Sequence, residues 1–346
     1  MYRKLIIFLF LVLTAVGASS AQRSKAPRPY PLSWHTDILG DGYESRYVDQ
    51  GTDYAGPVRS TIVRKLSVDT ASVVSKRAIL YVHGYNDYFF NRELGNECVS
   101  HGYNFYAVDL RRYGRSLMEG QHRFEARSMR EYFPDIDSAM VEISRQGVRE
   151  IVLMGHSTGG LITSYYLHCN PQAPVKALVL NSPFLDWNQG WLERFIPIVS
   201  WLGLLDPAMT IRQGASTAYS ESLLAGEHGR WHYNTQWKMP VSPDVTAGWV
   251  RAITLAQWAV RLPPRIRVPI LLMYSARSVE GGQWTPEHNE ADGVLDVHDI
   301  ARFGGYLGTD VTKVKVEGGL HDLVLSRPGV ARGVYRKIFS WLDKKL

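Results

Sequence analysis

Residues 151–160 read Ile151-Val-Leu-Met-Gly-His-Ser-Thr-Gly-Gly160 and are the most informative stretch of the chain. A short apolar run typical of a buried strand ends in Gly155-His-Ser-Thr-Gly159, and a helix-like segment follows over 161–168. A serine between glycines at a strand-to-helix turn is the context in which G-x-S-x-G exposes a nucleophile. The helix that begins behind it points backbone N–H groups at developing negative charge. We therefore predict that Ser157 is a nucleophile; the alternative is a glycine-rich turn with an incidental serine.

Apolar, strand-like runs alternate with helix-like segments on both sides of this motif. Strands are predicted at about 43–49, 58–66, 78–82, 104–109, 151–154, 175–181, 270–275 and 311–316, and helices at about 91–100, 129–146, 161–168 and 330–342. This alternation predicts an α/β fold with a mostly parallel central sheet flanked by helices. Residues 184–264 interrupt the alternation and are rich in tryptophan, so we predict an inserted helical cap there.

The amino-terminal residues resemble an export signal. Arg3 and Lys4 precede an apolar run over 5–16, and small residues end at Ala21. We expect an exported protein, periplasmic or secreted, with an uncleaved N-terminal membrane anchor as the alternative. The predicted organisation is a signal peptide (1–21), a linker (22–40), a first core part (41–183), the cap (184–264) and a second core part (265–346).

Composition narrows the function classes. The net charge of +6 is scattered and forms no long basic run, which argues against nucleic-acid binding. Peripheral contact with an anionic membrane surface stays open, and nothing indicates an oligomeric state. Cys98 and Cys169 fall in different predicted helices on opposite faces of the sheet, so we expect two buried free thiols.

A serine nucleophile needs a base, and a histidine oriented by a carboxylate is the usual one. With this strand–turn–helix motif, the chain order is serine, then acid, then histidine. His321 fits the last place, because Glu317-Gly-Gly-Leu-His321 follows the last predicted strand and precedes the last helix. We predict that His321 is the base.

The acid is expected after the strand at 270–275, where the loop is longer than the simplest pattern. Asp292 is the first choice, Asp296 the second and Glu280 the third. A metal site is the other interpretation of the acids and histidines here, but their spacing fits no tight ligand motif. That set is His288, Glu290, Asp292, Asp296 and His298.

Acyl transfer also needs backbone donors for the oxyanion. The N–H of Thr158, directly after the nucleophile, is one candidate. The second is the N–H of Tyr85, because His83-Gly84 ends a predicted strand and allows the backbone to turn toward the serine. His83 is expected to be structural, and His156 to pack or to bond locally.

Taken in order, several motifs resemble the α/β-hydrolase superfamily, and within it the lysophospholipase and monoacylglycerol-lipase-like branch that is grouped with serine aminopeptidases. The motifs are His83-Gly84, Asp109-Leu-Arg-Arg-Tyr-Gly-Arg-Ser116, Gly155-His-Ser-Thr-Gly-Gly160, Asn181-Ser-Pro-Phe184 and Gly318-Gly-Leu-His321. The resemblance implies a cofactor-free esterase or lipase with Ser157, Asp292 and His321 as the triad and the Tyr85 and Thr158 backbones as the oxyanion hole. Arg112 departs from the common pattern, which has glycine there.

We therefore expect an exported serine hydrolase acting on a small, lipid-like ester such as a monoacylglycerol or lysophospholipid, without metal or cofactor. The alternatives are an aminopeptidase-type peptidase and a non-catalytic binding protein on the same fold. An aminopeptidase needs an acidic subsite for the free amine of its substrate. The acids of the predicted cap are Glu193, Asp206, Glu221, Glu227 and Asp244, and nothing in the sequence singles one out.

Overall fold

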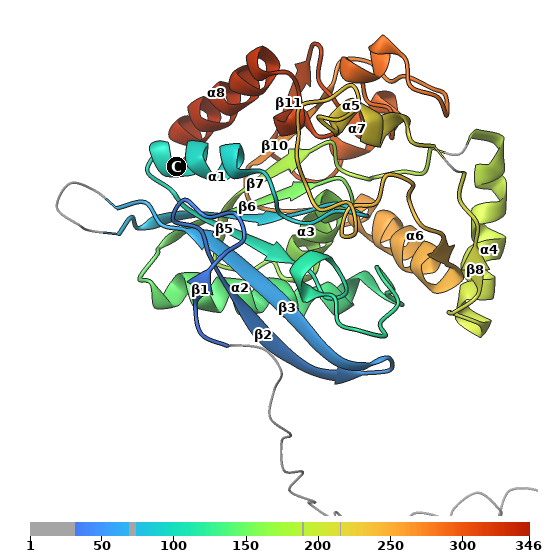
Figure 1. The fold of residues 1–346 in the computed structure, drawn as a ribbon, viewed down its shortest axis with the longest axis horizontal. Helices are drawn as coiled ribbons and strands as arrows, with labels where there is room; N and C mark the ends of the chain where they lie inside the picture. Colours follow the sequence, from blue (N-terminus) through green and yellow to red (C-terminus); the bar gives the residue numbers. More distant parts are fainter. Residues whose placement is uncertain (1–31, 69–73, 189, 215, 264) are drawn as a thin grey trace, which may run out of the picture. The chain divides into compact units, whose positions relative to one another are not determined.

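The computed structural model describes residues 32–68, 74–188, 190–214, 216–263 and 265–346. Its main feature is a nine-stranded sheet in the order β1-β2-β3-β5-β4-β6-β7-β10-β11 (Figure 1). The strands are β1 (His35–Thr36), β2 (Glu44–Asp53), β3 (Gly56–Lys65), β4 (Arg77–Val82), β5 (Asn104–Asp109), β6 (Glu150–His156), β7 (Val175–Asn181), β10 (Ile270–Ser275) and β11 (Val311–Val316). The pairs from β5 to β11 are parallel, and β1, β2 and β3 join antiparallel at one edge. The predicted α/β class is confirmed.

Helices cover both faces of this sheet. One face carries α1 (Arg92–Ser100) and α8 (Pro328–Lys345). The other carries α2 (Phe133–Arg145), α3 (Thr158–Cys169), α6 (Ala247–Arg261) and α7 (Val297–Gly304). Short 3-10 helices lie at Gly114–Ser116, Met129–Tyr132, Gly190–Phe195, Pro286–Asn289 and Leu323–Leu325.

The central strands are apolar throughout because both of their faces are buried. In β4, Leu80 and Val82 belong to the core cluster under α2 and α3, whereas Ile79 and Tyr81 belong to the cluster under α1 and α8. Successive side chains of a strand point to opposite faces, so a strand covered on both sides needs an uninterrupted apolar run. The same arrangement explains why α1 and α3, which carry Cys98 and Cys169, lie apart.

Both cysteines are free, as expected, although Cys169 is half-buried rather than buried. Two other sequence expectations need correction. The helix expected over 129–146 is divided into a 3-10 turn and α2, since Pro134 at the start of α2 favours a new helix beginning there. The helix α7 was not expected at all.

The segment between β7 and β10 contains α4 (Ile196–Leu205), α5 (Ala218–Leu223) and α6, with a small antiparallel pair, β8 (Thr210–Ile211) and β9 (Val245–Thr246). We call residues 182–269 the inserted segment. Its helix α6 contributes Trp249, Ile253 and other buried residues to the main core. The domain boundaries set out from the sequence stay a prediction, and the signal peptide and most of the linker lie outside the described residues.

Arg112 stands in a left-handed backbone conformation, with φ of 65°. Glycine adopts this conformation without strain, which accounts for the glycine of the common pattern. Here the arginine side chain is buried, and its Nη2 lies 2.7 and 2.6 Å from the two carboxylate oxygens of Asp53 at the end of β2. The guanidinium therefore ties the β2–β3 turn to the loop that follows β5.

Candidate active site

Ser157 lies on the turn between β6 and α3, with φ of 52° and ψ of −120°. The flanking glycines allow this turn. A Cβ on Gly155 would lie 2.6 Å from the carbonyl oxygen of Gly159, and a Cβ on Gly159 would lie 2.3 Å from the carbonyl oxygen of His83. Contacts this short are forbidden, so only glycine lets α3 begin against the end of β4. The strained, positive-φ serine is the expected conformation of a nucleophile on such a turn.

His321 and Asp292 form a buried pair beside the end of β10. The Nδ1 atom of His321 lies 2.9 Å from Oδ2 of Asp292, and the two residues are 2% and 0% exposed. The other carboxylate oxygen, Oδ1, accepts the N–H groups of Val294 and Leu295, each at 2.8 Å. The carboxylate is thus fixed on one side by the backbone and receives the imidazole on the other.

The long loop after β10 explains how Asp292 reaches this place. The N–H of Val279 donates to the carbonyl of Asp292 at 2.8 Å, and the N–H of Asp292 donates to the carbonyl of Arg277 at 3.0 Å. The chain therefore leaves β10, loops outward and returns beside its own start. Asp296 instead caps α7 by accepting the N–H of His298, and Glu280 is exposed. Within the described chain, Asp292 is the candidate acid hydrogen-bonded to His321.

The loop that carries His321 is fixed by two residues to which the sequence analysis gave no role. The side-chain amide of Asn181, at the end of β7, donates to Oδ1 of Asp322 at 2.6 Å, and its oxygen accepts the N–H of Leu323 at 3.1 Å. The hydroxyl of Ser275 donates to the carbonyl of Gly319 at 2.7 Å. The sequence signals were their places at the ends of two predicted strands and, for Asn181, its place in the motif Asn181-Ser-Pro-Phe184.

The loop after β4 lies directly against Ser157. A Cβ on Gly84 would lie 3.1 Å from the Cβ of Ser157, so Tyr85 follows at the point of closest approach. Thr158 is the first residue of α3, and the N–H groups of a first helical turn have no partner within the helix. His83 is structural as expected: Nδ1 lies 2.8 Å from the carbonyl of Gly84, and Nε2 accepts the N–H of Leu110 at 3.1 Å.

His156 lies between the turn at Ser157 and the His321 loop. Its Nδ1 is 3.1 Å from the carbonyl oxygen of Asn181, its Nε2 is 3.9 Å from Asp322, and its ring centre is 4.8 Å from that of His321. Burial lowers the pKa of His156, and the opposing effect of Asp322 does not cancel it. His156 is thus a neutral, locally bonded residue, in line with the packing role expected of it.

Asp87, His156 and Asp322 offer ligand atoms within 4.8 Å of one another, the one such grouping in the described ranges. Both carboxylates already have donors: the Lys238 ammonium lies 3.0 Å from Asp87, and Asn181 donates to Asp322. Burial by itself raises the pKa of Asp87, but the positive charge of Lys238, helped by neighbouring histidines, outweighs it and lowers the pKa. An ammonium group in this position opposes a cation, so the grouping does not suit a metal.

The inserted segment covers the site. The ring of Tyr219, on α5, lies edge-on to His321 with 5.6 Å between ring centres. Its hydroxyl is buried and has no hydrogen-bond partner in the described part of the chain. Ser157 is only 8% exposed. Ser157 and His321 are therefore both nearly enclosed, and an aromatic ring lies over His321.

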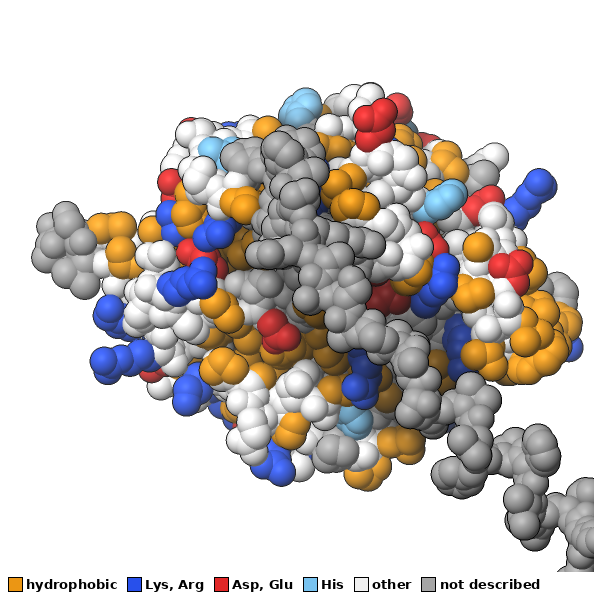
Figure 2. Space-filling view, turned by 90° about the horizontal axis from the view of Figure 1, so that it is seen from below, with side chains coloured by type: hydrophobic (Ala, Val, Ile, Leu, Met, Phe, Trp, Pro, Cys, Tyr) orange, Lys and Arg blue, Asp and Glu red, His pale blue; other side chains and the backbone are white. Residues whose placement is uncertain are grey.

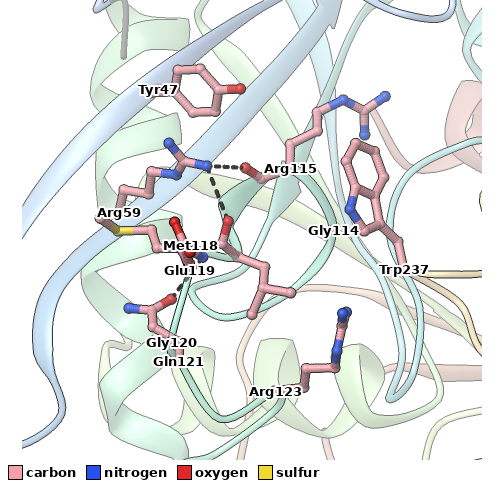
Figure 3. A pocket seen from close by; sticks show the side chains of 11 residues that line it. Tyr47, Arg59, Gly114, Arg115, Met118, Glu119, Gly120, Gln121, Arg123 and Trp237 are labelled. Carbon is pink, nitrogen blue, oxygen red and sulfur yellow. Dashed lines mark hydrogen bonds between the residues drawn. The ribbon is translucent and has the colours of Figure 1, made fainter. Parts of the chain in front are cut away.

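A separate pocket of about 320 Å³ lies near the β2–β3 hairpin and is shown in Figure 3. Three arginines border it, with Trp237 on one side. The guanidinium of Arg59 donates to the carbonyls of Arg115 and Leu117, at 2.9 and 3.1 Å. None of the predicted site residues lines this pocket, so it is distinct from the serine–histidine site.

Comparison with known proteins agrees with this architecture. The family model described as "Serine aminopeptidase, S33" matches residues 74–278, more than half of the chain. No curated protein matches the sequence. Solved structures similar to it include a soluble variant of monoglyceride lipase from Saccharomyces cerevisiae in complex with a substrate analog (15% identity, 92% of this chain and 99% of that one, TM-score 0.63). Another is the monoacylglycerol lipase of Paleococcus ferrophilus (18% identity, 87% of this chain and 99% of that one, TM-score 0.59). A third is alpha/beta hydrolase domain-containing protein 10 from mouse (14% identity, 86% of this chain and 98% of that one, TM-score 0.53). At these identities, the structural likeness establishes the fold.

Proposed function

Because the chain belongs to the serine aminopeptidase S33 family of α/β hydrolases, we propose that it cleaves carboxylic esters through an acyl-enzyme on Ser157. The observation that carries this proposal is the buried His321–Asp292 pair, 2.9 Å apart, beside a serine held at positive φ. An imidazole held in this way can take a proton from a serine hydroxyl and return it to a leaving group.

The proposed reaction has two halves. The Ser157 hydroxyl oxygen attacks the ester carbonyl while Nε2 of His321 takes its proton, and Asp292 stabilises the imidazolium through Nδ1. The tetrahedral oxyanion receives the N–H groups of Tyr85 and Thr158, and the leaving alcohol takes the proton from His321. Water then attacks the acyl-enzyme with His321 again as base. The carboxylic acid product leaves, and the proton returns from His321 to the Ser157 oxygen.

A lipid-like ester is the substrate that we favour. The space above His321 is bordered by the ring of Tyr219. Of the acids around it, Asp292 is paired with His321, and Asp87 and Asp322 already have donor partners. The names of the similar monoacylglycerol lipases point in the same direction. An aromatic wall of this kind suits an acyl chain better than a charged substrate.

The family name keeps an aminopeptidase as the alternative. A peptidase of this type needs a carboxylate that is free to bind a substrate amine. Among the acids noted in the inserted segment, Asp206 accepts the N–H of Ala208, Asp244 accepts the N–H of Gln213, and Glu227 is exposed. Glu221 accepts the hydroxyl of Thr217, and none of these four acids is placed beside Ser157 or His321 by a contact in the described residues. A non-catalytic binding role leaves the ordered serine, histidine and acid without a purpose.

The substrate class is tested with p-nitrophenyl acetate, butyrate, octanoate and palmitate beside monoacylglycerol, lysophospholipid and leucine p-nitroanilide. We expect hydrolysis of the esters, with kcat/KM rising from acetate to a longer chain. Cleavage of the anilide with no ester turnover would favour the aminopeptidase, and a folded protein inert to every substrate would favour the binding role.

We also propose that α4 contacts a lipid surface. Outward side chains at spacings of three and four on α4 and at the residue just before it form one apolar face that is exposed, and hydrophobic side chains gather at this part of the molecule in Figure 2. They are Phe195, Ile198, Trp201, Leu204 and Leu205. The exposed Arg194 precedes this face and the chain carries a net charge of +6, which favours a surface with anionic lipid. No helix in the described ranges is long and apolar enough to cross a membrane.

Vesicles test this contact. Protein should sediment with vesicles of phosphatidylcholine and phosphatidylglycerol, and the double variant Ile198→Ser/Trp201→Ser should bind about tenfold more weakly because it removes apolar surface. Trp258→Ser, on α6, is the control, since Trp258 is similarly exposed at 51%. Equal loss in both variants would contradict a role specific to α4.

Export is proposed on sequence alone, from the charged and apolar residues that precede Ala21. Intact mass of the protein from the culture fluid or periplasm should correspond to a chain that begins at Gln22. A full-length mass in the membrane fraction would favour the N-terminal anchor.

A further inference from the structure

Asn86, in the loop after β4, forms hydrogen bonds to the inserted segment. The side-chain amide donates to the carbonyl of Met239 at 2.8 Å, and its oxygen accepts the N–H of Met239 at 2.9 Å. Asn86 has φ of 47°, a left-handed conformation that asparagine adopts more readily than most residues but less readily than glycine. The two bonds to Met239 therefore stabilise a loop conformation that the local sequence alone favours less.

Asp87, the residue after Asn86, forms a buried ion pair with the inserted segment. The Lys238 ammonium lies 3.0 Å from the carboxylate of Asp87, and the two residues are 6% and 2% exposed. The rings of Tyr219, Tyr233 and Phe90 surround the ammonium at 5.6, 5.9 and 6.0 Å, within reach of a cation–π interaction. Because breaking a buried pair leaves an uncompensated charge, Lys238 holds its segment firmly against Asp87.

Tyr85, the residue before Asn86, also contacts the inserted segment. The hydroxyl of Tyr85 donates to the carbonyl of Pro243 at 3.1 Å, and its ring packs against Phe124 and Trp249 with centres 5.0 and 4.8 Å apart. Three consecutive residues, Tyr85 to Asp87, are thus fixed from residues 238–243. They follow Gly84, which lies against Ser157.

We propose that residues 238–243 form a brace that sets the oxyanion hole, with Asn86 and Lys238 as positioning residues for the N–H of Tyr85. The proposal rests on the proposed function, in which this N–H binds the tetrahedral oxyanion. An oxyanion donor acts only when it lies about 2.7–3.1 Å from the developing charge, and losing one costs about 10²–10³-fold in kcat. Loosening the brace should displace the donor and leave the hydrogen bond between His321 and Asp292 in place.

A contact that merely joined the inserted segment to the core would behave differently. Arg230 provides this comparison, because it comes from the same segment and pairs with Glu93 on α1 through two bonds of 2.7 Å. Replacing Arg230 with Met removes a segment-to-core contact that does not involve the loop after β4. Such a change should affect stability and leave kcat and KM as they were.

The test compares Asn86→Gly, the double variant Asp87→Asn/Lys238→Met and Arg230→Met on p-nitrophenyl butyrate. Glycine keeps φ of 47° accessible while removing both bonds to Met239, and the double variant leaves no unpaired buried charge. We expect kcat to fall about 10- to 100-fold in both brace variants, with KM within about twofold, since binding of the ground-state ester does not use the oxyanion donor. Affinity for an alkyl boronic acid, a tetrahedral mimic, should fall in parallel, and the pH profile of kcat/KM should keep its shape.

Brace variants that remain folded by circular dichroism and keep kcat within about threefold of the parent, or lose no more than Arg230→Met, would overturn the proposal. A shifted pH profile would also overturn it, because that assigns the damage to His321. The proposed function fails separately: a parent protein inert to the ester and to a fluorophosphonate probe removes both claims, whereas an active parent with unaffected variants removes only the brace.

Discussion

Two loops near the turn at Ser157, the loop after β4 and the loop that carries His321, are held by different parts of the molecule. The loop carrying His321 is fixed by Asn181 and Ser275, which end two strands of the central sheet. The loop after β4 is fixed by Met239 and Lys238, which come from the inserted segment. The position of His321, the proposed base, therefore depends on the core, whereas the position of Tyr85, the proposed oxyanion donor, depends on a segment that also covers the site.

The largest expected effect comes from removing the carboxylate that orients His321. Asp292→Asn should lower kcat on p-nitrophenyl butyrate by about 10³–10⁴-fold, because the amide no longer stabilises the imidazolium that forms during attack. KM should change little.

Asp296→Asn is the matched control on the same loop. Asp296 caps α7 through the N–H of His298, and asparagine caps nearly as well, so both activity and stability should stay near the parent values. Turnover that falls with Asp296→Asn and survives Asp292→Asn would mean that the acid is wrongly assigned.

A smaller effect sharpens the comparison. Asn181→Ala removes the hydrogen bonds to Asp322 and Leu323, so the His321 loop should loosen. We expect kcat to fall about 10- to 100-fold, which is less than the full loss of a general base would cost. Here the pH profile of kcat/KM should shift, in contrast to the brace variants.

Asn188→Ala is the control for that change, because Asn188 makes one exposed bond to the carbonyl of Val294. A loss of turnover in Asn181→Ala with an unchanged pH profile would show that the base does not depend on the core in the way described.

Much of the fold could be predicted because its signals are local. The central strands are uninterrupted apolar runs, and the glycines at 155 and 159 mark a turn that excludes any side chain. The helix α7 was missed because it is short and begins within an acidic loop. The triad candidates followed from chain order, and Asp292 lies beside His321 because its loop folds back on itself.

The supports of the site could not be predicted, since they join residues far apart in the chain. Asn86 and Met239 are separated by 153 positions and Asn181 and Asp322 by 141, and neither pair forms a motif. A polar residue on a loop is usually solvated, so the sequence alone assigns it no partner. Only the three-dimensional arrangement shows which loop polar groups are buried and paired.

The smallest expected effect is on the pH dependence of stability and concerns His156, which lies between the turn at Ser157 and the loop that carries His321. Burial lowers its pKa in the folded protein, so below about pH 6.5 the unfolded chain takes up a proton that the folded protein does not. Stability should therefore fall as the pH falls from about 7.5 to 5, by at most about 2 kcal/mol from this residue. Urea unfolding of the parent and of His156→Gln measures it, and a slope that is the same in both would contradict the assignment.

The central claim is that Ser157 is the nucleophile, and covalent labelling tests it most directly. Intact-mass measurement after treatment with a fluorophosphonate should show one phosphonyl adduct on the folded parent protein and none on Ser157→Ala. An adduct that persists in Ser157→Ala, or a folded parent that takes no label, would contradict the account.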